Sequence, residues 1–118
     1  MKRILVIDDD NLVRELLVDT LTPEGYTIEA AVNGAEGIRA FSSAPFDLIV
    51  TDLYMPEKEG IETIVELRRG FPAIKILAIS GGTAEQLRVA KLLGADATLS
   101  KPFELDALRD TVKILLGA

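Results

Sequence analysis

Near the middle of the chain, residues Asp47 to Gly60 read Asp-Leu-Ile-Val-Thr-Asp-Leu-Tyr-Met-Pro-Glu-Lys-Glu-Gly. The apolar run 48–50 predicts a short buried strand that leads into Asp52, and Pro56 prevents that strand from continuing. In open α/β sheets, ligands bind beyond the carboxyl ends of the strands, so Asp52 lies where a functional site is expected. Aspartate is also common in turns, and Asp52 alone therefore does not establish a site.

The composition excludes several classes of chemistry. The 118 residues suit a single domain over 1–118, and 48% hydrophobic residues are enough for a core. A net charge of −6 argues against binding to nucleic acid or to an anionic membrane. The chain has no Cys and no His, which excludes disulfides, thiol nucleophiles and imidazole chemistry. No apolar run is long enough for a membrane span or a signal peptide, so we expect a cytoplasmic protein.

Apolar runs alternate with amphipathic stretches along the whole chain. The expected strands are 3–7, 26–32, 48–50, 75–79 and 95–100. Each is followed by a stretch with helical spacing of apolar residues, such as Val13, Leu16, Leu17 and Leu21 in the first helix, or Val89, Ala90 and Leu93 in the fourth. This alternation predicts an α/β fold of five βα units, with a doubly wound parallel sheet covered by helices on both faces.

Polar residues at the expected helix starts support this assignment. Asp10 or Asn11 is placed to cap the first helix. Asn33 with Glu36, and Thr83 with Gln86, resemble capping boxes before the second and fourth helices.

Five polar residues follow expected strands. Asp8 and Asp9 follow the first strand, Asp52 the third, Ser80 the fourth and Lys101 the fifth. The common strand order 2-1-3-4-5 places the first strand beside the third, so the three carboxylates would crowd together. Such crowding raises carboxyl pKa values unless a cation compensates, and Mg²⁺ suits a site with oxygen ligands. A carboxylate can also act as a nucleophile towards phosphorus, with a lysine and a hydroxyl binding the phosphoryl oxygens.

The ordinary alternative is a set of unrelated turn residues, since Asp, Ser, Gly and Lys are frequent at strand–helix junctions. The coincidence of all of them at one edge of the sheet favours a site.

At this point the sequence resembles the receiver domain of two-component response regulators, which has a flavodoxin-like or CheY-like fold. The resemblance covers the whole chain. It rests on Ile-Leu-Val-Ile-Asp8-Asp9, Asp52-Leu-Tyr-Met55-Pro56 with Gly60, Ser80-Gly81 and Lys101-Pro102-Phe103.

The resemblance implies that Asp52 is the phosphoacceptor. It implies that Asp9 and Asp52 bind Mg²⁺ directly, together with the backbone carbonyl of Tyr54, while Asp8 acts mainly through a metal-bound water. Lys101 would pair with Asp52 or with its phosphate, before a proline that is commonly cis in this family.

The resemblance also assigns residues to signal transmission. Ser80 would be the switch hydroxyl that moves towards the phosphoryl group, with Gly81 beside the phosphate. The family often has an aromatic residue in the fifth strand, three positions before the lysine, and this chain has Thr98 there. Transmission through a moving aromatic ring is therefore in question, and backbone shifts of 80–83 and of the following helix would replace it.

The implied partner is a phosphohistidine donor, either a sensor histidine kinase or a histidine phosphotransfer protein. The output protein or domain is unknown. The fourth helix, fifth strand and fifth helix form the family's usual face for partners or for a homodimer. The chain would be a signalling phosphoacceptor rather than an enzyme, either as a stand-alone receiver or as an excised domain.

Two alternatives remain open from the residues. In a haloacid-dehalogenase-type phosphatase, Asp8 would be the nucleophile and Asp10 the general acid or base, with Ser80 and Lys101 binding phosphate. That family normally has an acidic pair on a further strand, which is missing after Lys101. The second alternative is a binding module that keeps the fold without using phosphorylation.

Overall fold

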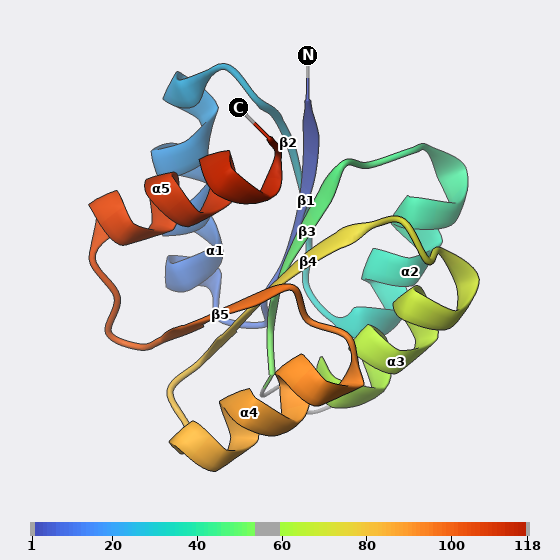
Figure 1. Ribbon diagram of the computed structural model, residues 1–118. Coiled ribbons are helices and arrows are strands. Elements are labelled where there is room, and N and C mark those ends of the chain that lie inside the picture. Colours follow the sequence, from blue (N-terminus) through green and yellow to red (C-terminus); the bar gives the residue numbers. More distant parts are fainter. Residues whose placement is uncertain (1, 54–59, 118) are drawn as a thin grey trace.

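The computed structural model describes residues 2–53 and 60–117 of the chain. Its strands form one parallel sheet in the order β2-β1-β3-β4-β5, as expected (Figure 1). The strands are β1 (Arg3–Ile7), β2 (Thr27–Ala31), β3 (Leu48–Asp52), β4 (Lys75–Ser80) and β5 (Ala97–Ser100). The sheet is therefore doubly wound, and the carboxyl ends of its strands meet at one edge.

The helices cover both faces of the sheet. They are α1 (Asn11–Leu21), α2 (Gly34–Ser43), α3 (Gly60–Gly70), α4 (Ala84–Leu93) and α5 (Leu105–Leu115), with a short 3-10 turn η1 (Thr22–Glu24) after α1. Helices α1 and α5 lie on one face, and α2, α3 and α4 lie on the other (Figure 1). Alternate side chains of β1 enter the two cores: Ile4 and Val6 pack with Leu17 and Leu108, whereas Ile7 packs with the α2–α4 layer.

Three helix starts follow the expected capping chemistry. The side chain of Asp10 accepts hydrogen bonds from the amides of residues 12 and 13, and Thr83 with Gln86 forms a complete capping box. Asn33 caps α2 by accepting from the Glu36 amide at 2.8 Å. The Glu36 carboxylate, however, binds the amide of Val32 at 3.3 Å, one residue before the position that a capping box requires.

The structure corrects the expected burial at several helix positions. Val89 and Leu93 were expected to face inward, but they are 37% and 42% exposed, while Leu87 and Ala90 are buried in the core. Leu16, also expected on an inward face, is 43% exposed. Helix α4 packs against β4, β5 and α3 through the face that carries Leu87 and Ala90, and Val89 and Leu93 lie outside that face.

Arg68 joins three segments on the side of the molecule opposite the carboxyl ends of the strands. Its guanidinium donates to the carbonyls of residues 72, 74 and 94, at 2.6–2.8 Å, and to the carboxylate of Asp96 at 2.8 Å. The same Asp96 oxygen accepts from the amide of Ile76. One half-buried side chain therefore fixes the α3–β4 and α4–β5 connections.

Candidate functional site

Three carboxylates gather at the carboxyl edge of the sheet. Asp8 directly follows β1 and Asp52 is the last residue of β3, and because β1 and β3 are neighbours the two side chains meet. One oxygen each from Asp8, Asp9 and Asp52 lies within 4.8 Å of the others. Asp8 and Asp52 are only 1% and 5% exposed, whereas Asp9 is exposed to solvent. The predicted acidic cluster is therefore present in the described part of the chain.

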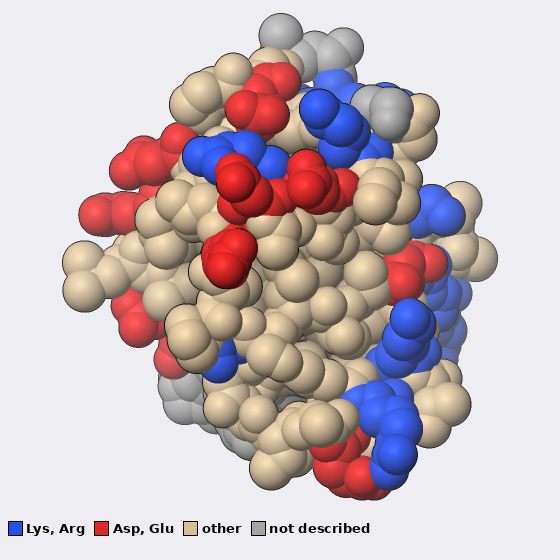
Figure 2. All heavy atoms as spheres, turned by 60° about the vertical axis from the view of Figure 1, so that its left-hand side comes forward, with Lys and Arg blue, Asp and Glu red and all other residues tan. Residues whose placement is uncertain are grey.

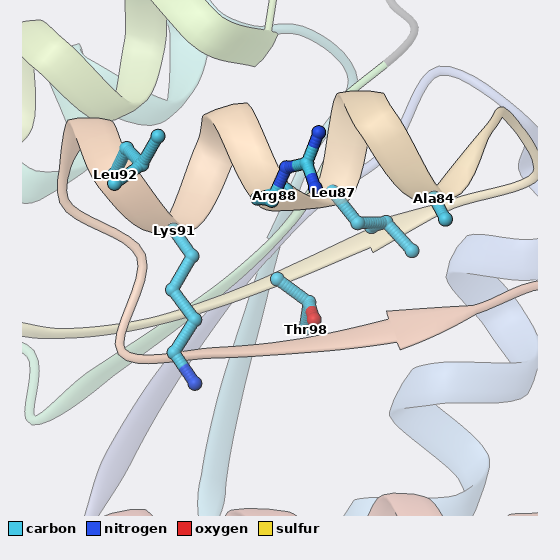
Figure 3. Close-up of a pocket in the computed structure, with 6 residues that line it drawn as sticks. All are labelled: Ala84, Leu87, Arg88, Lys91, Leu92 and Thr98. Carbon is cyan, nitrogen blue, oxygen red and sulfur yellow. The ribbon is translucent and has the colours of Figure 1, made fainter.

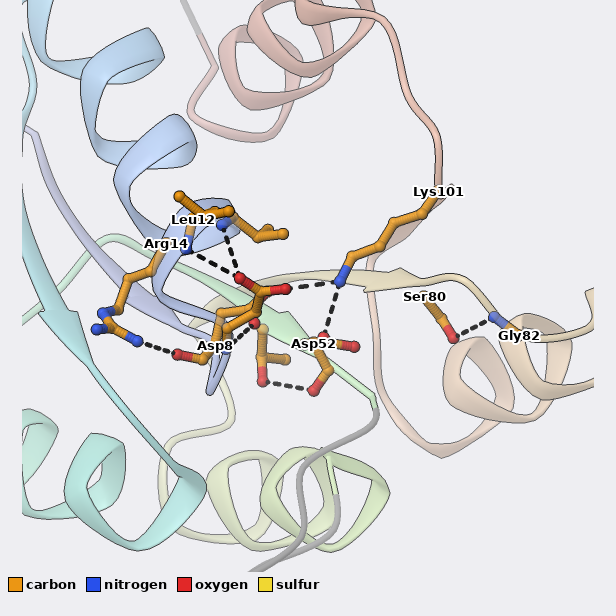
Figure 4. A network of polar contacts seen from close by, with 10 residues as sticks. Asp8, Leu12, Arg14, Asp52, Ser80, Gly82 and Lys101 are labelled. Carbon is orange, nitrogen blue, oxygen red and sulfur yellow. Dashed lines mark hydrogen bonds and ion pairs between the residues drawn. The ribbon is translucent and has the colours of Figure 1, made fainter.

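Lys101 brings a positive charge to this cluster from the end of β5. Its Nζ lies 2.9 Å from Oδ2 of Asp52 and 3.7 Å from Oδ2 of Asp8 (Figure 4). The Lys101–Pro102 peptide bond is cis, as the family resemblance implies. Residues from three strands thus converge on one small volume, and the negative charges outnumber the positive one.

The electrostatics of the cluster reflect burial and like charge. Burial, together with the neighbouring carboxylates of Asp52 and Asp9, raises the pKa of Asp8 from 3.8 to about 6, although the Asp10 amide and Lys101 oppose this rise. Burial lowers the pKa of Lys101, but its hydrogen bond to Asp52 and the surrounding carboxylates outweigh that effect and raise it above its usual value. Lys101 therefore stays charged, and its single positive charge only partly compensates the negative charge of the carboxylates.

The donor set fits a hard divalent cation. Oδ1 of Asp8 accepts a hydrogen bond from the Asp10 amide at 2.9 Å. Oδ2 of Asp8 is buried and has no hydrogen-bond partner among the residues that the structure describes. A buried oxygen in this condition, beside two further carboxylates, matches the all-oxygen ligands that Mg²⁺ prefers. Tyr54, whose carbonyl the resemblance adds as a ligand, lies outside the described residues, as do Met55 and Pro56.

Ser80 reaches the same edge but does not face the carboxylates. It is fully buried at the end of β4, and its hydroxyl accepts a hydrogen bond from the Gly82 amide at 2.9 Å (Figure 4). Gly81 lies along the stem of Lys101, where an added Cβ would be 3.7 Å from the lysine Cβ. That is an ordinary contact, so space alone does not require glycine at position 81.

Thr98 lies away from the carboxylates. It is half-buried in β5, paired in register with Ala78 of β4, and it faces α4 rather than the acidic cluster. The position at which the family resemblance leads one to expect an aromatic residue therefore contributes a small side chain to the α4–β5 side of the molecule (Figure 3).

Two positioning contacts were not expected from the sequence. The guanidinium of Arg14 donates to the backbone carbonyl of Asp8 at 2.8 Å and also to the side-chain oxygen of Asn11. The sequence contains one signal for the contact with Asp8. Arg14 lies one helical turn from the start of its helix, so its side chain can reach back towards the acidic cluster. Asp10, the general acid or base of the phosphatase alternative, is the expected cap of α1 and accepts hydrogen bonds from the amides of residues 12 and 13.

The sequence profile of the response regulator receiver domain matches residues 4–113. The chain belongs to this family. The receiver protein CpdR of Brucella abortus is 39% identical over 120 residues, covering 100% of both chains. The response regulator MprA of Mycobacterium ulcerans is 40% identical over 115 residues, which are 97% of this chain and 50% of that protein. This receiver domain therefore spans the full length of one relative and half the length of the other.

Solved structures agree with this assignment. The chemotaxis protein CheY4 of Vibrio cholerae matches with a TM-score of 0.91 and 30% identity, covering 98% of each chain. TrrA of Thermotoga maritima, solved in complex with Mg²⁺ and BeF, matches with a TM-score of 0.89 and 37% identity, covering 98% of this chain and 99% of that one. The chain is thus a signalling domain of the two-component class, and the phosphatase alternative is set aside. None of the described helices has the length and apolar character needed to cross a membrane.

Proposed function

We propose that Asp52 accepts a phosphoryl group from a phosphohistidine on a sensor kinase or a histidine phosphotransfer protein. The observation that carries this proposal is the 2.9 Å contact between Lys101 and the buried Asp52 carboxylate, beside two further carboxylates. A buried acid with a cation-binding set on one side and an ammonium on the other has what phosphoryl transfer needs.

In the transfer step, an Asp52 oxygen attacks the phosphorus, the phosphorus–nitrogen bond breaks, and the donor imidazole leaves with the bonding electron pair. The product is an acyl phosphate on Asp52. Asp8, Asp9 and Asp52, with the carbonyl of Tyr54, would hold Mg²⁺, which when bound supplies positive charge to the phosphoryl oxygens. Lys101 is close enough to exchange its carboxylate partner for a phosphoryl oxygen as the transfer proceeds.

Signal transmission would begin at Ser80. Its hydroxyl holds the Gly82 amide in this structure, two residues before the capped start of α4. If the hydroxyl turns to the phosphoryl group, the Gly82 amide loses this partner and the 80–83 loop can shift. The α4–β5–α5 face would then change for an output partner or for a second copy of the domain.

The phosphodonor would approach along α1. Leu12 and Leu16 are 77% and 43% exposed, and Leu16 lines a small pocket with Phe103 beside Lys101. Exposed apolar residues next to a charged site suit a transient protein contact. This arrangement favours a protein donor. We further propose that the transfer takes place in the cytoplasm and that residues 1–118 form a single receiver domain.

Intact mass spectrometry tests the proposal. Incubation with Mg²⁺ and acetyl phosphate should add one acid-stable, base-labile phosphoryl group, which Asp52→Asn should not acquire. Asp110→Asn is a matched control, since Asp110 is exposed on α5, and it should be phosphorylated like the wild type. Uptake by Asp52→Asn would refute the assignment of the acceptor. No uptake by the wild type with Mg²⁺ would favour the phosphorylation-independent module.

A further inference from the structure

Asp9 is the least supported of the three carboxylates in the acidic cluster. It is exposed, and no hydrogen bond or ion pair reaches its side chain from the described residues. Asp8 differs, because its Oδ1 accepts from the Asp10 amide at 2.9 Å. Asp52 is held by Lys101, also at 2.9 Å. The place of the Asp9 carboxylate within the cluster therefore depends on the backbone that carries it.

Arg14 holds the backbone directly before Asp9. Strand β1 ends at Ile7, and the Asp8 amide still donates to the carbonyl of Ala31 at 3.2 Å. The Asp8 carbonyl lies beyond the end of the strand and accepts from Nη1 of Arg14 at 2.8 Å. This carbonyl and the Asp9 amide belong to one planar peptide group. The Arg14 guanidinium therefore fixes the plane of the peptide that joins Asp8 to Asp9.

Asn11 orients the guanidinium. Arg14 and Asn11 lie three residues apart at the start of α1, and Nη2 of Arg14 donates to the side-chain oxygen of Asn11. The two terminal nitrogens thus have separate acceptors, an arrangement that suits the planar fork of arginine and that a lysine ammonium does not reproduce. In Figure 4, Arg14 reaches the Asp8 backbone from α1, on the side away from Lys101.

Geometry and charge make opposite predictions for Arg14. A guanidinium repels a divalent cation, so removal of its charge alone would strengthen Mg²⁺ binding. The arginine, however, donates to a backbone carbonyl and to an amide oxygen, not to a carboxylate of the cluster. Its contacts therefore act on the backbone of the β1–α1 loop, and their loss would free Asp9 to leave the cluster and weaken Mg²⁺ binding.

We propose that Arg14 is a positioning residue for the cation site, because it holds the Asp8–Asp9 peptide in the orientation that brings both carboxylates to Asp52. Removal of a hydrogen-bond partner behind a metal ligand typically weakens metal binding about 10–100-fold. The inference rests on the proposed function only in taking this cluster as the Mg²⁺ site.

Titration of the metal-free protein with Mg²⁺, followed by the amide NMR signals of residues 8–14, measures this role without a phosphodonor. Arg14→Met keeps an apolar stem and should bind Mg²⁺ about tenfold more weakly than the wild type. Arg14→Lys keeps the charge but not the fork, so it should restore only part of the affinity.

A control of equal charge is available elsewhere on the molecule. Lys and Arg side chains lie at several separate places on the surface (Figure 2). Arg69 is exposed in the last turn of α3, at the far end of that helix from the acidic cluster. Arg69→Met also removes one positive charge, and it should bind Mg²⁺ like the wild type.

Asn11 provides a second variant that leaves Arg14 in place. Asn11→Ala removes the oxygen that orients the guanidinium, while Asp10 still caps α1. It should weaken Mg²⁺ binding severalfold in the wild-type background and have no further effect in Arg14→Met, because the two residues act through one contact. If the amide spectrum shows that Arg14→Met is not folded, Asn11→Ala tests the same role.

Urea unfolding in EDTA separates positioning from a purely structural role. A structural role would lower the free energy of unfolding of Arg14→Met and leave its Mg²⁺ affinity unchanged, and that result would overturn the proposal. Tighter Mg²⁺ binding by Arg14→Met, equal effects of Asn11→Ala in both backgrounds, or no Mg²⁺ binding by the wild type would overturn it as well.

Phosphoryl uptake by the wild type is scored separately by mass. Normal uptake together with unchanged Mg²⁺ affinity of Arg14→Met removes only the positioning role. Weakened Mg²⁺ binding by Arg14→Met without uptake by the wild type removes only the proposed phosphoacceptor function.

Discussion

Replacing Asp8 by Asn should stabilise the metal-free protein at neutral pH, although Asp8 is a candidate metal ligand. Its carboxylate is 1% exposed, and one oxygen lacks a hydrogen-bond partner among the described residues. Asn keeps an oxygen for the Asp10 amide and removes the negative charge. The substitution therefore replaces an incompletely compensated buried charge by a neutral group of the same shape.

The magnitude follows from the pKa of Asp8, which rises from 3.8 to about 6 in the folded protein. Because the folded state favours the neutral acid, ionisation of Asp8 lowers the free energy of unfolding. This loss grows as the pH rises from 3.8 to about 6. The cost is about 3 kcal/mol above pH 7, since each unit of the pKa shift corresponds to about 1.4 kcal/mol. It falls to roughly half of that at pH 5 and disappears below the unfolded pKa, where both states are protonated.

Thermal and urea unfolding in EDTA between pH 5 and 7.5 measure this difference. At pH 7.5, Asp8→Asn should melt on the order of 10 °C above the wild type, and the gap should narrow at pH 5. Added Mg²⁺ should stabilise the wild type through ligand binding and the variant much less. Asp110→Asn, an exposed control, should follow the wild type at every pH. A variant no more stable than the wild type at pH 7.5, or an advantage independent of pH, would refute the reasoning.

Three other substitutions test further parts of the structure. Lys101→Met should slow phosphoryl uptake from acetyl phosphate at least tenfold in mass assays, because it removes the ammonium beside the acceptor carboxylate. Arg68→Ala should lower the urea-derived free energy of unfolding by about 2–3 kcal/mol through the loss of four charge-assisted hydrogen bonds, whereas the exposed Arg69→Ala should change it by less than about 0.5 kcal/mol. Gly37→Ala should cost about 1–3 kcal/mol in the same assay, because its Cβ would come within 2.9 Å of the buried Cγ1 of Ile7, and unchanged stability would contradict that close contact.

The strand order and the two-layer core could be predicted because they depend on periodicity. Runs such as 4–7 and 48–50 are apolar at every position, which suits strands buried on both faces, and the parallel arrangement then fixes which ends meet. Burial along α4 could not be predicted in the same way. Its apolar residues include Val89 and Leu93, and only the tertiary packing of α4 against β4, β5 and α3 decides that they stay exposed.

The members of the acidic cluster could also be predicted, but their individual environments could not. Asp8 and Asp9 are adjacent in sequence, and the sequence does not tell which one is buried against β3 and which one faces solvent. The contact of Arg14 with the Asp8 carbonyl and the bond between Ser80 and Gly82 likewise depend on rotamers set by tertiary packing. These details decide the electrostatics, and motif spacing does not contain them.

The position of Ser80 explains why a small residue at Thr98 need not disconnect the acidic cluster from the α4–β5 face. Ala78 and Ser80 are two residues apart on β4, so they point to the same side of the sheet. Ala78 pairs with Thr98 in the sheet beneath α4, and the Ser80 hydroxyl accepts a hydrogen bond from the Gly82 amide in the loop that leads into α4 at Ala84. A movement of the Ser80 side chain would therefore shift the loop at the start of α4 while leaving the strands beneath the helix in place.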